Sequence, residues 1–110
     1  MDELPTLNIT NFEKMAHGDA DGLRELAFDF FSDMRRLLPD WSGLVESGGF
    51  DRLREEFHRC KGGASLFGLE RMVAILSRWE KPGALEQEFD LQVFEQELSA
   101  AEKAVEDLAA

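Results

Sequence analysis

The sequence contains one cysteine, few basic residues and no long apolar run, and each shortage excludes a class of protein. Cys60 alone can form neither an internal disulfide nor a zinc site built from several cysteines. No apolar stretch approaches the roughly 20 residues that cross a bilayer. The acidic start MDELPTLNIT also lacks the basic and apolar pattern of a secretory signal. We therefore expect a cytoplasmic protein with no membrane partner.

Basic residues are outnumbered by 23 acidic to 12, which gives a formal net charge of −11. A chain this acidic is not expected to bind nucleic acid, because the phosphate backbone would repel it. The exception lies between residues 52 and 71, where five basic and three acidic side chains give a net charge of +2. This island suits an anionic group or an acidic partner surface, although ordinary charge pairing on a helix is the alternative.

What the sequence does contain is apolar side chains at helical spacing along most of its 110 residues. The chain has the length of one domain, and we expect a single domain over 1–110. The pattern predicts an all-α protein: an N-terminal extension with a short helix over 1–17, then an up-down-up-down four-helix bundle over 19–109. We expect the short helix to begin after Thr10 or Asn11 and to end at His17 and Gly18.

Gly68 is expected to end the second bundle helix, and the pattern is expected to be disturbed or broken at other places as well. Pro39 is expected to kink or interrupt the first of them, because proline removes an amide donor and clashes with the preceding turn. Ser47-Gly48-Gly49 and Lys81-Pro82-Gly83 are expected to be loops, and residues 84–90 a loop or a frayed first turn. The apolar stripes of the first and last bundle helices are Leu23, Leu26, Ala27, Phe30, Met34, Leu37 and Leu38, and Leu91, Phe94, Leu98, Ala101, Val105 and Leu108.

The second bundle helix carries an unusual stretch, HRCKGGASLFG over 58–68. Its apolar residues fall within a wedge of about 100° on a helical wheel, which predicts the buried face. They are Phe50, Leu53, Phe57, Cys60, Ala64 and Phe67. His58 lies opposite this wedge, with Lys61, Gly62, Ser65 and Leu69 within about 60° of it. The imidazole is therefore predicted to be exposed, whereas Cys60 is predicted to be a buried apolar filler.

The two glycines at 62 and 63 need an explanation, because glycine costs about 1 kcal/mol per helix position relative to alanine. A neutral imidazole is a nucleophile that can carry a group covalently. A phosphoryl group on its outer nitrogen would need a nearby cation, which Lys61 supplies one turn along. Bare backbone at Gly62 and Gly63 would let a partner approach closely.

These residues resemble the signature of histidine-containing phosphotransfer (HPt) domains. The family pattern has a histidine, then lysine-glycine at plus three and four, small residues, a large apolar residue and glycine at plus ten. The matching residues here are His58, Lys61, Gly62, Ala64, Phe67 and Gly68. The resemblance extends from about Gly18 to Trp79 and departs from the family at Pro39, Phe57 and Gly63.

The resemblance implies a phosphocarrier that relays a phosphoryl group between receiver-domain aspartates and His58 in a multistep two-component phosphorelay. Lys61 would stabilise the phosphoryl charge, and Gly62 would permit docking. The expected partners are the receiver domain of a response regulator, a hybrid sensor histidine kinase, or both. We expect a monomer with no cofactor of its own, Mg²⁺ on the receiver, and no kinase activity, since the chain has no Gly-rich phosphate loop. It would be a transfer intermediate rather than a self-sufficient enzyme.

The alternatives to this interpretation assign other roles to His58. The chain could be a non-catalytic HPt-like module that binds or sequesters a receiver or kinase without being phosphorylated. A metal site would pair His58 with Glu55, but a di-metal bundle needs such a pair from two helices. His17 has no lysine-glycine after it and is interpreted as a helix-end residue.

The predicted docking face for the receiver consists of Gly62, Ser65, Leu66 and Leu69. Phe28 and Phe31 widen the stripe of their helix and are expected to pack under the N-terminal helix. The alternative is that one of them joins Leu66 and Leu69 in an apolar patch beside His58.

Overall fold

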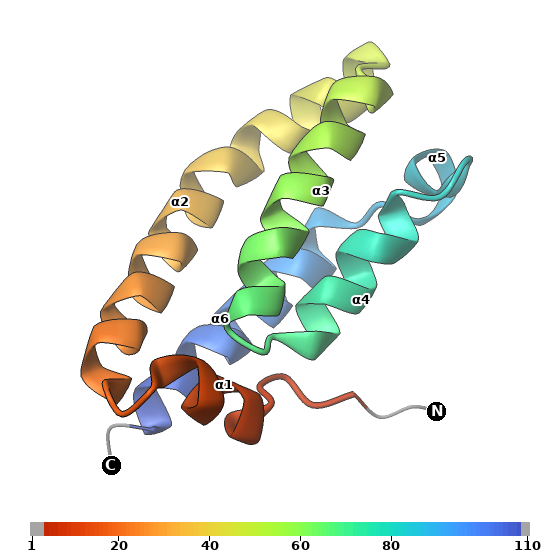
Figure 1. Ribbon diagram of the computed structural model, residues 1–110. Helices are drawn as coiled ribbons and strands as arrows, with labels where there is room; N and C mark the ends of the chain where they lie inside the picture. Colours follow the sequence, from red (N-terminus) through yellow and green to blue (C-terminus); the bar gives the residue numbers. More distant parts are fainter. Residues whose placement is uncertain (1–3, 109–110) are drawn as a thin grey trace.

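The computed structural model describes residues 4–108, which fold into six helices and no strand. The helices are α1 (Ile9–Ala16), α2 (Ala20–Ser47), α3 (Phe50–Leu66), α4 (Glu70–Trp79), α5 (Ala84–Glu88) and α6 (Leu91–Asp107). In Figure 1, α2, α3, α4 and α6 run alternately up and down, and α1 lies across the lower end of the bundle. The predicted all-α helical bundle is confirmed.

Local side-chain chemistry sets the ends of the first two helices. The Asn8 side chain accepts a hydrogen bond from the Asn11 amide at 3.0 Å, so α1 begins at Ile9, earlier than predicted. His17 ends α1 in the left-handed region with φ 49°. Asp19 then caps α2, because its carboxylate accepts from the Gly22 amide at 3.0 Å.

Of the two expected effects of Pro39, a kink or an interruption, the interruption does not occur, because α2 is one continuous helix through that residue. A proline inside a helix costs about 3 kcal/mol. The segment after it is held by Trp41, which is fully buried and whose indole N–H donates to Glu56 on α3 at 2.8 Å. Burial of an aromatic side chain of this size stabilises by a comparable amount, so tertiary packing can offset the local cost of the proline.

Each of the four long bundle helices contributes one aromatic ring to a layer in the core. Phe57 on α3 contacts Trp41 on α2 with ring centres 4.8 Å apart, and Trp79 on α4 at 5.5 Å. Phe94 on α6 completes the layer, 5.3 Å from Trp41 and 5.8 Å from Trp79. All four side chains are buried. The layer fixes the relative positions of the helices at the level of residue 57, next to His58.

Two further expectations need correction. Leu26, expected in the buried stripe of α2, is 56 % exposed, because the stripe instead follows Leu23, Ala27 and Phe31. Residues 84–90 are not a loop or a frayed turn of the last helix. They contain the separate helix α5, whose Leu85 is 1 % exposed and anchors it to the core.

The chain before α1 is tied to the turn between α3 and α4. The Asn8 amide donates to the Gly68 carbonyl at 2.8 Å, and the Asn8 side chain donates to Glu70 at 2.5 Å. Gly68 has φ 75° and would place a Cβ 3.0 Å from the Asn8 carbonyl oxygen. Glycine is therefore required there by both conformation and space. This turn sets how α4 returns along α3.

Candidate functional site

His58 projects into solvent from the middle of α3, with its side chain 78 % exposed. Its neighbour Phe57 is fully buried in the aromatic layer, and Cys60, Ala64 and Leu53 share that buried face. Because successive residues of a helix lie about 100° apart, packing Phe57 inward turns the next side chain outward. The predicted exposure of the imidazole is confirmed.

The lysine one turn along does not point freely into solvent. The Lys61 ammonium lies 2.6 Å from one carboxylate oxygen of Glu80, and the other oxygen of Glu80 lies 3.5 Å from Nδ1 of His58. Lys61 is 27 % exposed and Glu80 22 % exposed, so this pair is less solvated than the ring beside it. His58, Lys61 and Glu80 therefore form one polar cluster, which we call the triad.

Glu80 is the functional candidate that the sequence did not predict. It follows Trp79 at the end of α4, and the Glu80 amide donates to the Leu76 carbonyl at 3.2 Å. Trp79 packs on Phe57, so the residues after each of these aromatics are brought together. A signal existed in the spacing: α3 and α4 form an antiparallel hairpin around Gly68, and His58 and Glu80 lie ten and twelve residues from that turn.

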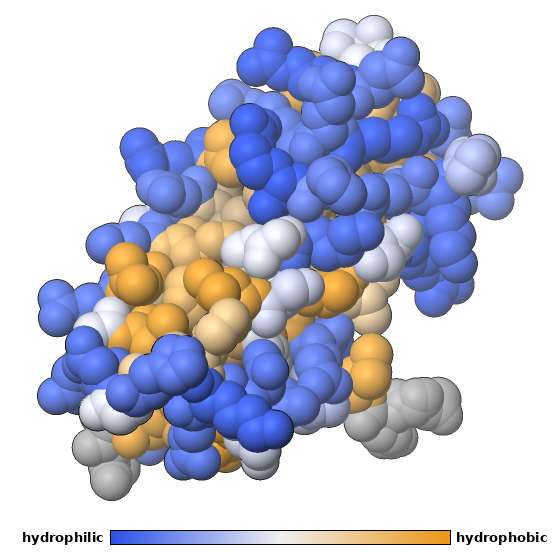
Figure 2. Space-filling model, viewed as in Figure 1, coloured by the Kyte–Doolittle hydropathy of each residue, from blue (hydrophilic) through white to orange (hydrophobic). Residues whose placement is uncertain are grey.

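The other flank of His58 is apolar. Phe30 of α2 lies against α3, where a Cβ at Gly63 would fall 2.6 Å from the phenyl ring. Leu66, one turn beyond Gly63, is 41 % exposed, and Leu26 extends this surface along α2. Figure 2 shows apolar surface between the lower parts of α2 and α3. We call Leu26, Phe30 and Leu66 the apolar flank.

The two glycines of the site differ in their surroundings. A Cβ at Gly62 would have no other heavy atom within 4 Å, whereas one at Gly63 would collide with Phe30. Gly62 therefore leaves open space beside His58, and Gly63 allows α2 to approach α3. The aromatic side chain that lies against α3 at Gly63 is Phe30. Phe31 is 1 % exposed, in the core.

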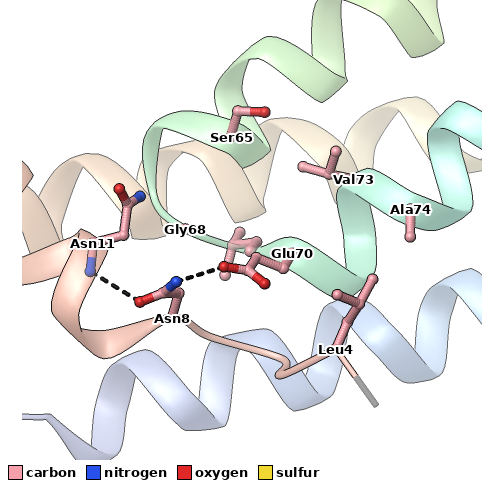
Figure 3. A pocket seen from close by; sticks show the side chains of 9 residues that line it. Leu4, Asn8, Asn11, Ser65, Gly68, Glu70, Val73 and Ala74 are labelled. Atoms are coloured by element: carbon pink, nitrogen blue, oxygen red, sulfur yellow. Dashed lines mark hydrogen bonds between the residues drawn. The ribbon is translucent and has the colours of Figure 1, made fainter. Parts of the chain in front are cut away.

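The prediction that Leu69 belongs to the docking face is wrong. Leu69 is fully buried, because α3 ends at Leu66 and the chain turns at Gly68, which directs Leu69 into the core. Its angle on the extended helical wheel therefore does not apply. Ser65 is exposed, two turns from His58, on the rim of a hollow of about 370 Å³. Figure 3 shows this hollow between α3, α4 and the segment at Leu4 and Asn8.

Cys60 lies on the opposite side of α3 from His58 and is 6 % exposed. Burial, with the nearby Glu56 carboxylate, raises the pKa of its thiol from 9.0 to about 11, although Arg59 opposes the shift. The thiolate is therefore scarce at neutral pH, which agrees with the predicted role of an apolar filler.

Two other properties of the described chain bear on the site. Within residues 4–108 no group of three or more His, Cys, Asp or Glu side chains is arranged to hold a metal ion. None of the helices in that range is both long and apolar enough to span a bilayer.

The fold and the triad together define a class: a helical bundle that presents one solvent-facing histidine, with a cation and a carboxylate beside it, from the middle of a helix. The family model described as Hpt domain matches residues 25–110, so the chain belongs to the Hpt domain family. Domains of this family take part in histidine phosphotransfer within phosphorelays and interact with receiver domains and kinases. Searches of curated proteins and of solved structures gave no significant match.

Proposed function

We propose that this protein is a phosphocarrier in which His58 accepts a phosphoryl group from a receiver-domain aspartate and passes it to another. The observation that carries the proposal is the 78 % exposed imidazole with the Lys61 ammonium one helical turn away. An imidazole in this position is accessible to a second protein. A lysine within reach can neutralise part of the charge on a carried phosphoryl group.

Glu80 orients the nucleophile. Its carboxylate lies 3.5 Å from Nδ1 of His58, where it favours a proton on that nitrogen. The lone pair then resides on Nε2, the outer nitrogen. In the proposed step Nε2 attacks phosphorus in line, the bond from phosphorus to the aspartate oxygen breaks, and the aspartate leaves as a carboxylate. Mg²⁺ held by the receiver would stabilise the charge that develops on the transferred group.

The receiver docks on the face that contains Gly62 and the apolar flank. Gly62 offers open space beside the imidazole, and Leu66 offers an exposed apolar contact. An interface of standard size buries about 800 Å² per partner, so it would extend well beyond His58. Ser65, two turns along the same helix, falls within such a footprint.

The test is transfer of label from a radiolabelled phospho-receiver to the protein. We expect an acid-labile, base-stable phosphate on the wild-type protein and on His17→Asn, and none on His58→Gln. His17→Asn is the matched control, because asparagine tolerates the left-handed backbone of residue 17. A complex with the receiver that never acquires label would contradict the proposal and favour a binding module in which His58 is not phosphorylated.

A further inference from the structure

The ion pair between Lys61 and Glu80 has a consequence for the phosphorylated state. In the structure the lysine ammonium already has a partner, a carboxylate oxygen at 2.6 Å. A phosphoryl group on Nε2 of His58 would bring about two negative charges to the same side of α3. The single positive charge of one ammonium cannot neutralise both anions, so the two compete for it.

We propose that Glu80 competes with the phosphoryl group of His58 for Lys61 and thereby weakens the hold of this protein on the phosphoryl group. The inference rests on the proposed function and adds to it a preferred direction of phosphoryl transfer. The carboxylate favours the unphosphorylated state, in which it retains the lysine, and so favours transfer onward to a receiver. Glu80 is thus a positioning residue that acts on the phosphoryl group through Lys61.

The surroundings of Glu80 support this role. The side chain is 22 % exposed, so water screens its charge less than that of a fully solvated carboxylate. Glu80 is the C-cap residue of α4, its amide donates to the Leu76 carbonyl, and the neighbouring Trp79 is buried against Phe57. Glu80 therefore cannot easily move away when His58 becomes phosphorylated. Lys61, with its long flexible side chain, is the member of the triad that can change partner.

The test uses phosphoramidate, which phosphorylates histidine without a partner protein. Nε2 attacks its phosphorus, the N–P bond to His58 forms, the P–N bond of the donor breaks, and the protonated donor nitrogen leaves as ammonia. A His17→Asn background confines the label to His58. The ³¹P resonance is then followed against pH, because the second ionisation of the phosphoryl group reports a neighbouring cation.

In Glu80→Gln we expect the proton affinity of the phosphoryl group to fall by about twofold to fivefold, the size expected for a partly exposed charge pair. Glutamine keeps an oxygen that can accept from Nδ1, so the ¹⁵N shifts of the unphosphorylated ring should report the same tautomer as in wild type. Glu88→Gln is the matched control, since Glu88 pairs with Arg78 away from the triad. It should change neither measurement.

The double variant Lys61→Ala/Glu80→Gln separates competition from direct repulsion. If Glu80 acts through the lysine, replacing Glu80 should hardly change the proton affinity of the phosphoryl group once Lys61 is absent. An equal effect of Glu80→Gln with and without Lys61, or no effect in either background, overturns the inference. Neither result would contradict the proposed function, which is tested separately by transfer of label from a receiver to His58.

Discussion

The two faces of α3 have opposite surroundings although their residues alternate along one stretch of chain. His58 is 78 % exposed while Phe57 is fully buried, and Gly62 faces open space while Gly63 contacts Phe30. The inner face is shaped by packing and tolerates little change in volume. The outer face contributes little to packing, so its composition reflects accessibility and charge. This contrast predicts that substitutions one residue apart will affect different properties.

The largest expected effect is on stability, at the inner face. Phe57→Ala removes the ring that contacts both Trp41 and Trp79, and we expect it to lower the free energy of unfolding by about 3–5 kcal/mol. His58→Gln, at the next residue, should change it by less than about 0.5 kcal/mol. Urea unfolding followed by tryptophan fluorescence measures both. Equal losses of unfolding free energy in the two variants would contradict the distinction between the two faces.

The next effect is on transfer, at the outer face. Gly62→Trp places a large side chain in the space beside His58, and we expect the rate of phosphoryl transfer from a receiver to fall about tenfold, a barrier increase of about 1.4 kcal/mol. Gly43→Trp is the control, because a Cβ added at Gly43 would also have no heavy atom within 4 Å, but this glycine lies on α2. Neither variant should unfold more easily than wild type, since glycine is the poorer helix former. Normal transfer by Gly62→Trp would show that the partner does not cover this position.

A smaller effect is expected at the edge of the outer face. Leu66→Glu should weaken receiver binding by about threefold to tenfold, because it puts a charge into an apolar contact. Val93→Glu is the control: Val93 is 44 % exposed on α6, close to the 41 % of Leu66. Titration of a labelled receiver gives both affinities. If the two variants bind alike, the apolar flank is not part of the interface.

How much the sequence could predict also differs between the two faces. The inner face of α3 follows from apolar spacing alone, because burial depends on position around one helix. The outer face depends on what neighbouring helices bring to it, and helical spacing cannot specify that. Glu80 and Phe30 come from α4 and α2, so they were missed as site residues. Leu69 was assigned to the wrong side because the wheel was continued past the end of the helix.

The last expected effect is of a different kind, the chemical reactivity of a side chain on the inner face. The thiol of Cys60, with its pKa raised to about 11, should react with iodoacetamide at pH 8 at least tenfold more slowly than the same cysteine in urea-unfolded protein. A raised folded-state pKa means that the folded protein retains the proton longer than the unfolded chain does. The contribution of Cys60 to stability is therefore complete below pH 9 and is lost as the pH rises toward 11. Cys60→Ser should remove that part of the alkaline destabilisation. Fast reaction of native wild-type protein with iodoacetamide would contradict the prediction and show that the inner face opens more readily than its packing indicates.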